Sequence, residues 1–396
     1  MIKGMRSLLT TALLILIVGC ATPTEPEPDL ILARNLAKMQ TRPSNVDLAW
    51  RTPKERVAGV ANANAFVARN DALLTASLKT ALEYSLQHAG QGLMVWHDGN
   101  LIASQFAAGL TARSPFASYS MHKSVLALTL LAAIEDGYLT SLDDPVGRYL
   151  KVWRNDPRGD ITLRQLLNHA SGLTYYSYTA PEAAAINFSG RMREAAINTP
   201  LSSAPGTSFQ YNNVNSLVLG LALEKALEKR GLRYAQYLSQ RIWQPLGNGD
   251  AAVWLDHPGG VARYHSGLEA GLGSWLNIGV MLANGGRVGE RQVLSTTSIT
   301  ALTEASSTNP AYGLHVWLGS AWQQSRSYGP GTPQRVLHSE PYLASDVWFF
   351  DGFGGQRVYV IPSARLVIAR FGAVDMAYDD AYIVNTLLRG LGETTP

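Results

Sequence analysis

Cysteine is almost absent from this chain of 396 residues, which contains a single one, Cys20. Without a second cysteine no disulfide can form within the chain, so packing alone must hold the fold. The chain also lacks a strong excess of either charge, with 33 Lys and Arg residues against 30 Asp and Glu residues. A balance this even gives no indication of nucleic-acid binding.

Metal-binding patterns are missing as well. The sequence has no His-Glu-x-x-His motif and no cysteine cluster. His169, His265 and His338 do not show the spacing of metal ligands. We therefore expect no metal and no cofactor.

The N-terminus carries a targeting pattern. Lys3 and Arg6 precede an apolar run from residue 8 to 18, which is too short to span a bilayer comfortably and predicts an export signal over residues 1–19. The segment Ile17-Val18-Gly19-Cys20 resembles the bacterial lipoprotein cleavage box, so Cys20 is the expected lipidation site. The alternative is a simple secretory signal followed by an incidental thiol.

A tether is expected after Cys20. Proline and glutamate alternate over residues 21–29, which is typical of a solvated linker, and we assign residues 20–69 to this tether and an N-terminal extension. Several acyl chains on Cys20 would give stable attachment to a membrane. The predicted location is the bacterial cell envelope, with the domain of residues 70–396 outside the cytoplasm.

Candidate chemistry centres on the tetrapeptide Ser120-Met121-His122-Lys123. Residues three apart are neighbours on a helix, so the lysine amine can reach the serine hydroxyl. An amine activates a serine only if its surroundings keep it partly neutral near pH 7. The apolar residues that follow, up to Gly137, predict a buried helix that supplies such surroundings.

A short motif can also arise by chance. Lys123 is the only one of the eight lysines with a serine three residues before it. The interpretation of Ser120 as a nucleophile and Lys123 as its base therefore depends on other motifs in the chain.

Strand patterns lie near both ends of the domain expected at residues 70–396. Residues 71–88 have helical periodicity, and residues 93–97 and 101–106 flank a hairpin turn at Asp98-Gly99-Asn100. Residues 347–352, 356–362 and 364–371 are typical strands, and residues 374–391 predict a closing helix. The pattern indicates an α+β fold, an antiparallel sheet covered by helices, with a sheet region at 70–119 and 304–396 and a mostly helical region at 120–303.

Three sequence blocks are similar to a known family. They are GLMVWHDGNLIASQFAAG with SPFASYSMHKSVLALTLLAAIEDGYLTSLDDPVGRYL, then ITLRQLLNHASGL, then PGTSFQYNNVNSLVLGLALEKA. Over about residues 93–371 the chain resembles the penicillin-recognising serine hydrolases, in the branch of class C β-lactamases, D-alanyl-D-alanine peptidases, esterases and aminohexanoate-dimer hydrolases. The resemblance implies a β-lactamase/transpeptidase-like fold.

The third block matches the family's Tyr-x-Asn element as Tyr211-Asn212-Asn213. By this resemblance Tyr211 shares proton transfer with Lys123, because a nearby ammonium would stabilise its phenolate. Asn213 would bind substrate, although capping the amphipathic helix expected over residues 214–230 explains it equally well. Ordinary packing is the alternative for Tyr211.

The last block departs from the family pattern. Where the family has Lys or His, then any residue, then Gly, this chain has Phe353-Gly354-Gly355, followed by Gln356. The resemblance implies that the backbone N–H groups of Ser120 and Gln356 form an oxyanion hole, and that Phe353, Gly354 and Gly355 border the substrate. A plain glycine-rich turn is the alternative. Without the aligned cation, a preference for substrate carboxylates becomes doubtful.

These observations predict a serine hydrolase that cleaves an ester or amide through an acyl-enzyme intermediate. Its expected partner is a small-molecule substrate, with the membrane contacted through the lipid anchor. One alternative is a β-lactamase or D-alanyl-D-alanine peptidase acting on cell-wall-like substrates. Another is a non-catalytic envelope binding protein with the same fold.

Overall fold

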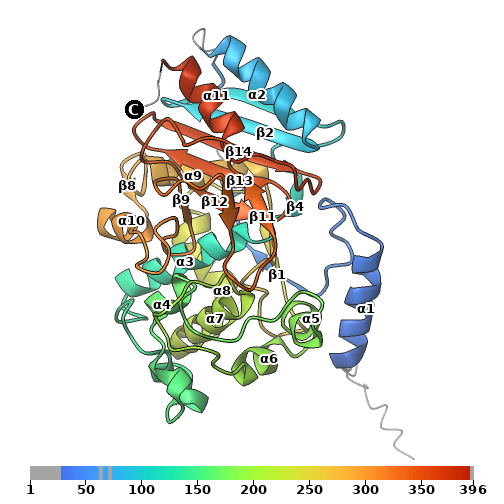
Figure 1. The fold of residues 1–396 in the computed structure, drawn as a ribbon, viewed down its shortest axis with the longest axis vertical. Coiled ribbons are helices and arrows are strands. Elements are labelled where there is room, and N and C mark those ends of the chain that lie inside the picture. The colour runs from blue at the N-terminus through green and yellow to red at the C-terminus, as the bar shows by residue number, and fades with distance from the viewer. Residues whose placement is uncertain (1–27, 62–65, 70–73, 393–396) are drawn as a thin grey trace, which may run out of the picture.

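A six-stranded antiparallel sheet forms one half of the protein (Figure 1). The structure, a computed structural model, describes residues 28–61, 66–69 and 74–392. The sheet has the order β3-β2-β14-β13-β12-β9. Its strands come from both ends of the sequence, as predicted. They are β2 (Gly90–His97), β3 (Asn100–Phe106), β9 (Trp317–Leu318), β12 (Trp348–Gly352), β13 (Gln356–Ile361) and β14 (Leu366–Gly372).

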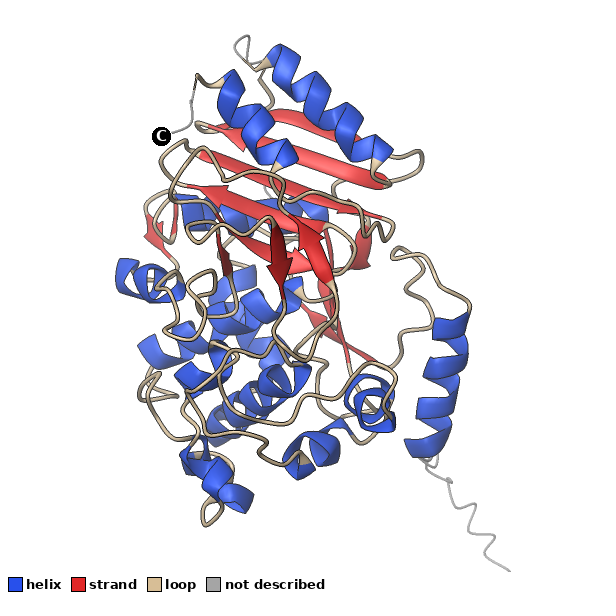
Figure 2. Ribbon diagram, viewed as in Figure 1, coloured by secondary structure: helices blue, strands red, loops and turns tan. Residues whose placement is uncertain are grey.

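Helices cover both faces of this sheet (Figure 2). Helices α2 (Thr75–Gln87) and α11 (Tyr382–Gly390) lie on one face, and α9 (Leu272–Ala283) packs against the other. Every residue of β13 and β14 is consequently buried. The predicted hairpin between β2 and β3 is confirmed, and both Asp98 (φ 44°) and Gly99 (φ 89°) have the left-handed backbone that such a two-residue turn needs.

The closing helix is shorter than predicted, because α11 begins at Tyr382 rather than at residue 374. Aspartate side chains explain the difference. The Asp375 carboxylate accepts a hydrogen bond from the Ala377 N–H at 2.8 Å, and Asp379 accepts one from the Ala381 N–H at 3.0 Å. These local bonds compete with helical ones for the backbone donors, so residues 374–381 form a loop.

A second sheet joins distant parts of the chain. Its strands β1 (Lys54–Val57), β5 (Ala251–Trp254), β6 (Leu268–Gly271) and β4 (Pro115–Ala117) have the order β1-β5-β6-β4. Residues 120–303 are mostly helix and loop, as predicted, but they also contribute β5 and β6 to this sheet. Strands of four residues are too short to leave a clear alternating pattern.

Part of the predicted N-terminal extension belongs to the folded body. Helix α1 (Pro28–Gln40) packs against α5 (Pro181–Phe188), and β1 pairs with β5. The Lys54 ammonium lies 2.6 Å from the buried Glu269 carboxylate of β6. Residues 28–61 of the expected extension thus pack on the domain. The predicted signal segment and Cys20 lie outside the described residues.

The other half of the protein is built around two long helices, α3 (Met121–Glu135) and α7 (Asn213–Leu227). Helix α3 is buried along nearly its whole length, as predicted. Helix α7 was expected to be amphipathic, but it is also buried almost all round. A methyl group on Gly220 of α7 would lie 2.1 Å from the Tyr264 ring, which shows how closely a loop covers this helix.

Shorter elements complete the described chain. The remaining helices are α4 (Leu163–Leu167), α6 (Met192–Asn198), α8 (Tyr234–Leu238) and α10 (Thr296–Leu302). Two small hairpins are β7 (Arg287–Val288) with β8 (Arg291–Gln292), and β10 (Ser325–Ser327) with β11 (Arg335–Leu337). Single helical turns lie at Val146–Arg148, Lys151–Trp153, Pro157–Asp160, Glu228–Arg230 and Ser239–Trp243. Among the described residues, no helix has the length and apolar character needed to cross a membrane.

The contact between α9 and the sheet makes one glycine critical. A Cβ on Gly279 would lie 2.5 Å from Val367 and 3.0 Å from Val358, both stiff side chains on strands. We expect Gly279→Ala to destabilise the protein by about 1–3 kcal/mol through overpacking. Gly273→Ala, in the same helix, meets its nearest atom at 3.4 Å and should be neutral or slightly stabilising. Urea unfolding measures both, and equal stability of the two variants would contradict this packing.

Candidate active site

Ser120 and Lys123 meet at the start of α3, as their spacing predicts. The Lys123 ammonium nitrogen Nζ lies 2.9 Å from the Ser120 hydroxyl oxygen, and it donates a second hydrogen bond of 3.1 Å to the His265 carbonyl. Ser120 is the residue just before the helix, and Tyr119 before it has a left-handed backbone (φ 48°). Such a conformation is uncommon for a tyrosine and turns the chain sharply into the helix.

Burial allows part of the Lys123 amine to be neutral at neutral pH. Its side chain is 1% exposed, and burial lowers its pKa to about 7, against an opposing effect of the Asp351 carboxylate. A large fraction of the amine is therefore neutral near pH 7. It can then accept the proton of the Ser120 hydroxyl.

Tyr211 completes this group. It lies two residues before α7 and borders the same pocket as Ser120, close enough for the Ser120 side chain to affect its pKa. Lys123 Nζ lies over the tyrosine ring, 4.8 Å from its centre, rather than beside the hydroxyl. Burial, helped by Tyr312 and Asp351, raises the pKa of Tyr211 well above its usual value. The expectation of a stabilised phenolate is therefore wrong, and Tyr211 remains a neutral phenol.

His122, next to the serine, is a packing residue. Its ring is completely buried and accepts a hydrogen bond from the Gly267 N–H at 3.1 Å, and its other nitrogen lies 2.9 Å from the Tyr234 hydroxyl. These bonds fix the loop that carries the His265 carbonyl. The acceptor for the lysine ammonium is thereby held in place.

The glycine-rich turn lies against the same site. It joins β12 to β13, and Gly354 and Gly355 both have positive φ angles, of 75° and 91°. A Cβ on Gly352 would lie 2.5 Å from the Ser118 carbonyl, so this hairpin abuts the segment that leads into Ser120. Phe353, Gly354 and Gly355 border one pocket together with Ser120 and Tyr211.

Gln356 follows the turn and is fully buried. Its side-chain amide bridges to β14, accepting from the Gly372 N–H at 3.0 Å and donating to the Gly372 carbonyl at 2.9 Å. The side chain thus fixes the first residue of β13. The role of its backbone N–H in an oxyanion hole stays a prediction.

Asn213 does not border this pocket. Its amide donates to the Asn187 side chain at 2.8 Å, and it faces an adjoining hollow that also contacts Tyr175 and Tyr211. The helix cap is Asn212, whose side chain accepts a hydrogen bond from the Val214 N–H at 3.2 Å. The interpretation of Asn213 as the cap is therefore wrong by one residue.

Six aromatic side chains contribute to the pocket wall, and sequence reasoning did not find most of them. The wall residues beyond the predicted site include Tyr175, Tyr178, Tyr328, Val336, Met376 and Tyr378. Tyr328 directly follows β10, and Val336 lies on β11. The others come from loops with no motif. Phe353 is 49% exposed and stands at the rim.

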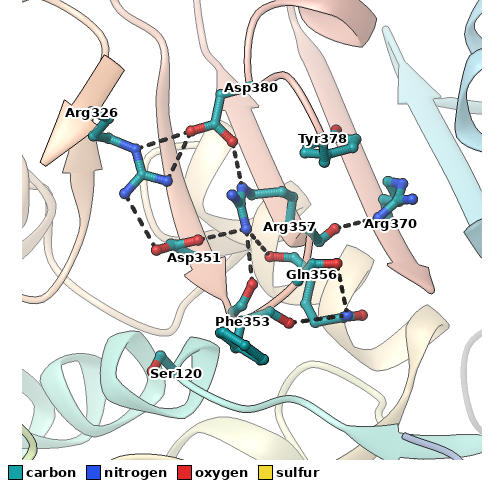
Figure 3. Close-up of polar contacts among 12 residues, drawn as sticks. Ser120, Arg326, Asp351, Phe353, Gln356, Arg357, Arg370, Tyr378 and Asp380 are labelled. Carbon is teal, nitrogen blue, oxygen red and sulfur yellow. Dashed lines mark hydrogen bonds and ion pairs between the residues drawn. The ribbon is translucent and has the colours of Figure 1, made fainter. Parts of the chain in front are cut away.

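Two arginines near the pocket are already paired (Figure 3). Arg357 contacts Asp351 at 2.5 Å and Asp380 at 2.7 Å, and Arg326 contacts Asp380 at 2.8 Å and Asp351 at 3.3 Å. Two positive and two negative charges thus cancel in a buried cluster. Arg370 points away from it and donates to the Gly355 carbonyl at 2.6 Å.

With this geometry established, the sequence can be compared with known proteins. Residues 65–374 match the family described as Beta-lactamase. The chain belongs to the Beta-lactamase family.

Solved structures support the corresponding fold. A putative 6-aminohexanoate-dimer hydrolase from Bacillus anthracis superposes with a TM-score of 0.68 at 19% identity, covering 88% of this chain and 91% of that one. A putative beta-lactamase from Bacteroides dorei DSM 17855 gives 0.63 at 20% identity, covering 82% and 98%. The predicted β-lactamase/transpeptidase-like α+β fold is confirmed.

Curated relatives match a smaller part of the chain. Protein flp of Staphylococcus aureus strain MW2 is 26% identical over 186 residues, which are 43% of this chain and 36% of that protein. Penicillin-binding protein 4* of Bacillus subtilis strain 168 is 29% identical over 150 residues, 37% of this chain and 32% of that protein. The chain thus spans about a third of the length of these relatives.

The environment of Lys123 predicts a direct spectroscopic result. In protein with 13C-labelled lysine, we expect the Lys123 side-chain signal to titrate with a midpoint of about 7, because burial disfavours the ammonium. Loss of that signal in Lys123→Ala assigns it. A Lys123 signal that stays in its ammonium position above about pH 9 would show that the amine is not available as a base.

Proposed function

We propose that this protein is a serine hydrolase that cleaves an ester or amide through an acyl-enzyme. The observation that carries the proposal is the 2.9 Å contact between the Ser120 hydroxyl and a buried amine whose pKa is about 7. A serine is a poor nucleophile unless a neighbouring base removes its proton. Members of this family include serine hydrolases, which agrees with the chemistry of the pair.

Each proton in the reaction has a donor and an acceptor. The Ser120 oxygen attacks the substrate carbonyl while Lys123 takes the hydroxyl proton, and the backbone N–H groups of Ser120 and Gln356 stabilise the oxyanion. Tyr211, as a neutral phenol beside Ser120, relays the proton from Lys123 to the leaving group. Water then attacks the acyl-enzyme while Lys123 accepts a proton from it, and Lys123 returns that proton to the departing Ser120 oxygen, giving the free acid and restoring the Ser120 hydroxyl.

The pocket favours an uncharged substrate. Phe353 stands where the family places a cation, and the guanidinium groups of Arg326 and Arg357 are neutralised by Asp351 and Asp380. Arg370 is held on backbone carbonyls. These pairings remove the obvious substitutes for the missing positive charge, and the aromatic wall suits an apolar group.

A second candidate is a β-lactamase or D-alanyl-D-alanine peptidase. The match to Penicillin-binding protein 4* supports it, although only a third of that relative is covered. A non-catalytic binding protein of the envelope is the remaining alternative. Parallel assays with short-chain esters, D-amino-acid amides and a chromogenic cephalosporin separate the two enzymes, and labelling by an active-serine phosphonate separates both from a binding protein.

The catalytic pair predicts a non-additive loss of activity. Ser120→Ala and Lys123→Ala should each lower kcat by roughly three orders of magnitude or more, and the double variant should be little worse, because the two residues act as a unit. Phosphonate labelling and kinetics measure this, and circular dichroism controls for folding. Near-normal turnover by folded Ser120→Ala protein would end the proposal.

Substrate charge gives another prediction. Wild-type kcat/KM should be higher for a neutral ester than for the matched ester with a carboxylate, and β-lactam hydrolysis should be weak. Phe353→Lys should shift the ratio toward the carboxylate by roughly 10- to 100-fold, the value of one charge-assisted hydrogen bond. Phe353→Met is the uncharged control and should not shift it. Efficient wild-type hydrolysis of a cephalosporin would contradict this specificity.

We also propose that the protein is exported and anchored in the cell envelope through a lipid on Cys20. Support comes from the apolar run and cleavage box before this residue. Cys20→Ser should move the protein from the membrane fraction to the soluble fraction and leave specific activity unchanged. Mass spectrometry showing an unmodified Cys20 behind an intact leader would refute the anchor.

A further inference from the structure

His169 has several features that ordinary packing does not explain. Its side chain is 1% exposed, and its backbone is left-handed (φ 55°), which is uncommon for a residue with a side chain. Burial, helped by His315 and Lys123, lowers its pKa well below the usual value, so the ring is neutral. Its Nε2 atom is buried without a hydrogen-bond partner among the described residues. Both the backbone and this atom cost stability.

The same residue holds the chain on both sides of Tyr211. The Gln210 N–H donates to the His169 carbonyl at 2.8 Å, and the Asn212 N–H donates to His169 Nδ1 at 3.2 Å. The imidazole also packs on the Tyr211 ring, with 4.4 Å between ring centres. The backbone carbonyl and the side chain of His169 therefore hold the N–H groups of the residues before and after Tyr211. The imidazole ring also packs on one face of the Tyr211 ring.

A hydrogen-bond chain sets the imidazole tautomer. The Ser171 hydroxyl donates to the Asn215 side-chain oxygen at 2.6 Å, which turns the amide nitrogen of Asn215 toward His169 Nδ1 at 2.9 Å. Nδ1 thus faces two N–H donors and must be the acceptor, and the proton resides on Nε2. The unpartnered Nε2 is a consequence of presenting Nδ1 to the backbone beside Tyr211.

We propose that His169 is a positioning residue for the reaction: it clamps Tyr211 so that the phenol stays beside Ser120 in the pocket that both residues border. The expected effect on kcat rests on the proposed function. The clamp itself concerns only the position of Tyr211, which a structure can show without any assay. His169 does not border the pocket that contains Ser120. It acts only through Tyr211.

A matched control exists in the same cluster. His315 stacks on His169 with 4.6 Å between ring centres, is 2% exposed, and has a similar left-handed backbone (φ 56°). Its ring bonds the Ser216 side chain at 3.0 Å, and no hydrogen bond joins it to residues 210–212 within the described chain. His315→Leu therefore imitates the loss of packing and of one hydrogen bond without touching the segment that carries Tyr211.

The test compares His169→Leu, His169→Asn and His315→Leu in the full chain. In His169→Leu we expect kcat to fall about 10- to 100-fold with KM within about twofold, because a displacement of about 1 Å in a reacting group has such an effect. Asparagine retains an acceptor near Nδ1 and tolerates a left-handed backbone, so His169→Asn should recover kcat to within about fivefold of wild type. His315→Leu should lower Tm as much as His169→Leu does, yet lower kcat less than about threefold.

Crystal structures of the variants give a readout that does not depend on activity. We expect the Tyr211 hydroxyl to leave Ser120 in His169→Leu and to stay in His315→Leu. If His169→Leu does not fold, His169→Met replaces it, since methionine adapts to irregular space and also lacks the acceptor.

Two results would overturn the clamp. One is a His169→Leu or His169→Met structure in which the Tyr211 hydroxyl keeps its wild-type position beside Ser120. The other is an equal loss of kcat in the two leucine variants at equal Tm. Failure of the proposed function is distinct, because it would appear as wild-type protein that no phosphonate labels at Ser120, and the structures would still decide where Tyr211 lies.

Discussion

The burial of one lysine beside one serine is the constraint on which the site depends. An ammonium in water would be fully charged at pH 7 and would leave the Ser120 hydroxyl inert. Lys123 instead sits at the buried end of α3, where loss of hydration lowers its pKa to about 7. The nearly all-apolar sequence of α3 and the burial of α7 are what keep water away from this amine.

Burial also keeps the histidine rings around Lys123 uncharged. His265 and His169 have pKa values well below normal, and that of His315 is about 3, in each case first because of burial and further because of the Lys123 charge. These rings stay neutral, so Lys123 is the group among them that exchanges a proton near neutrality. Asp351 supplies the nearby negative charge, but two arginines hold it, which limits how far it raises the lysine pKa.

Sequence reasoning located the parts of the site that have local signatures. The i, i+3 spacing of Ser120 and Lys123, the buried helix after them and the β2–β3 turn all follow from short-range rules. The neutral state of Tyr211 did not follow, because it depends first on burial and then on Tyr312 and Asp351, more than a hundred residues away in sequence. The ion pairs of Arg357 likewise depend on contacts that spacing does not reveal.

Sequence reasoning also failed to place the start of α7, most residues of the pocket wall, and strands β5 and β6. Asn212 rather than Asn213 caps α7, since both are good caps and only the backbone conformation decides between them. The pocket wall draws Tyr175 from one loop and Tyr378 from another, so no motif could have joined them. Strands β5 and β6 exist because they pair with each other and with distant segments, which is a tertiary effect rather than a local preference.

The central claim is that Ser120 becomes acylated during turnover. Rapid acid quenching of the enzyme during hydrolysis of a neutral ester, followed by intact-mass and peptide analysis, tests it most directly. The account predicts a transient mass increase equal to the acyl group, located on the peptide that contains Ser120 and absent from Ser120→Ala protein. Steady turnover with the adduct on a different residue, or with an unchanged adduct in Ser120→Ala protein, would contradict it.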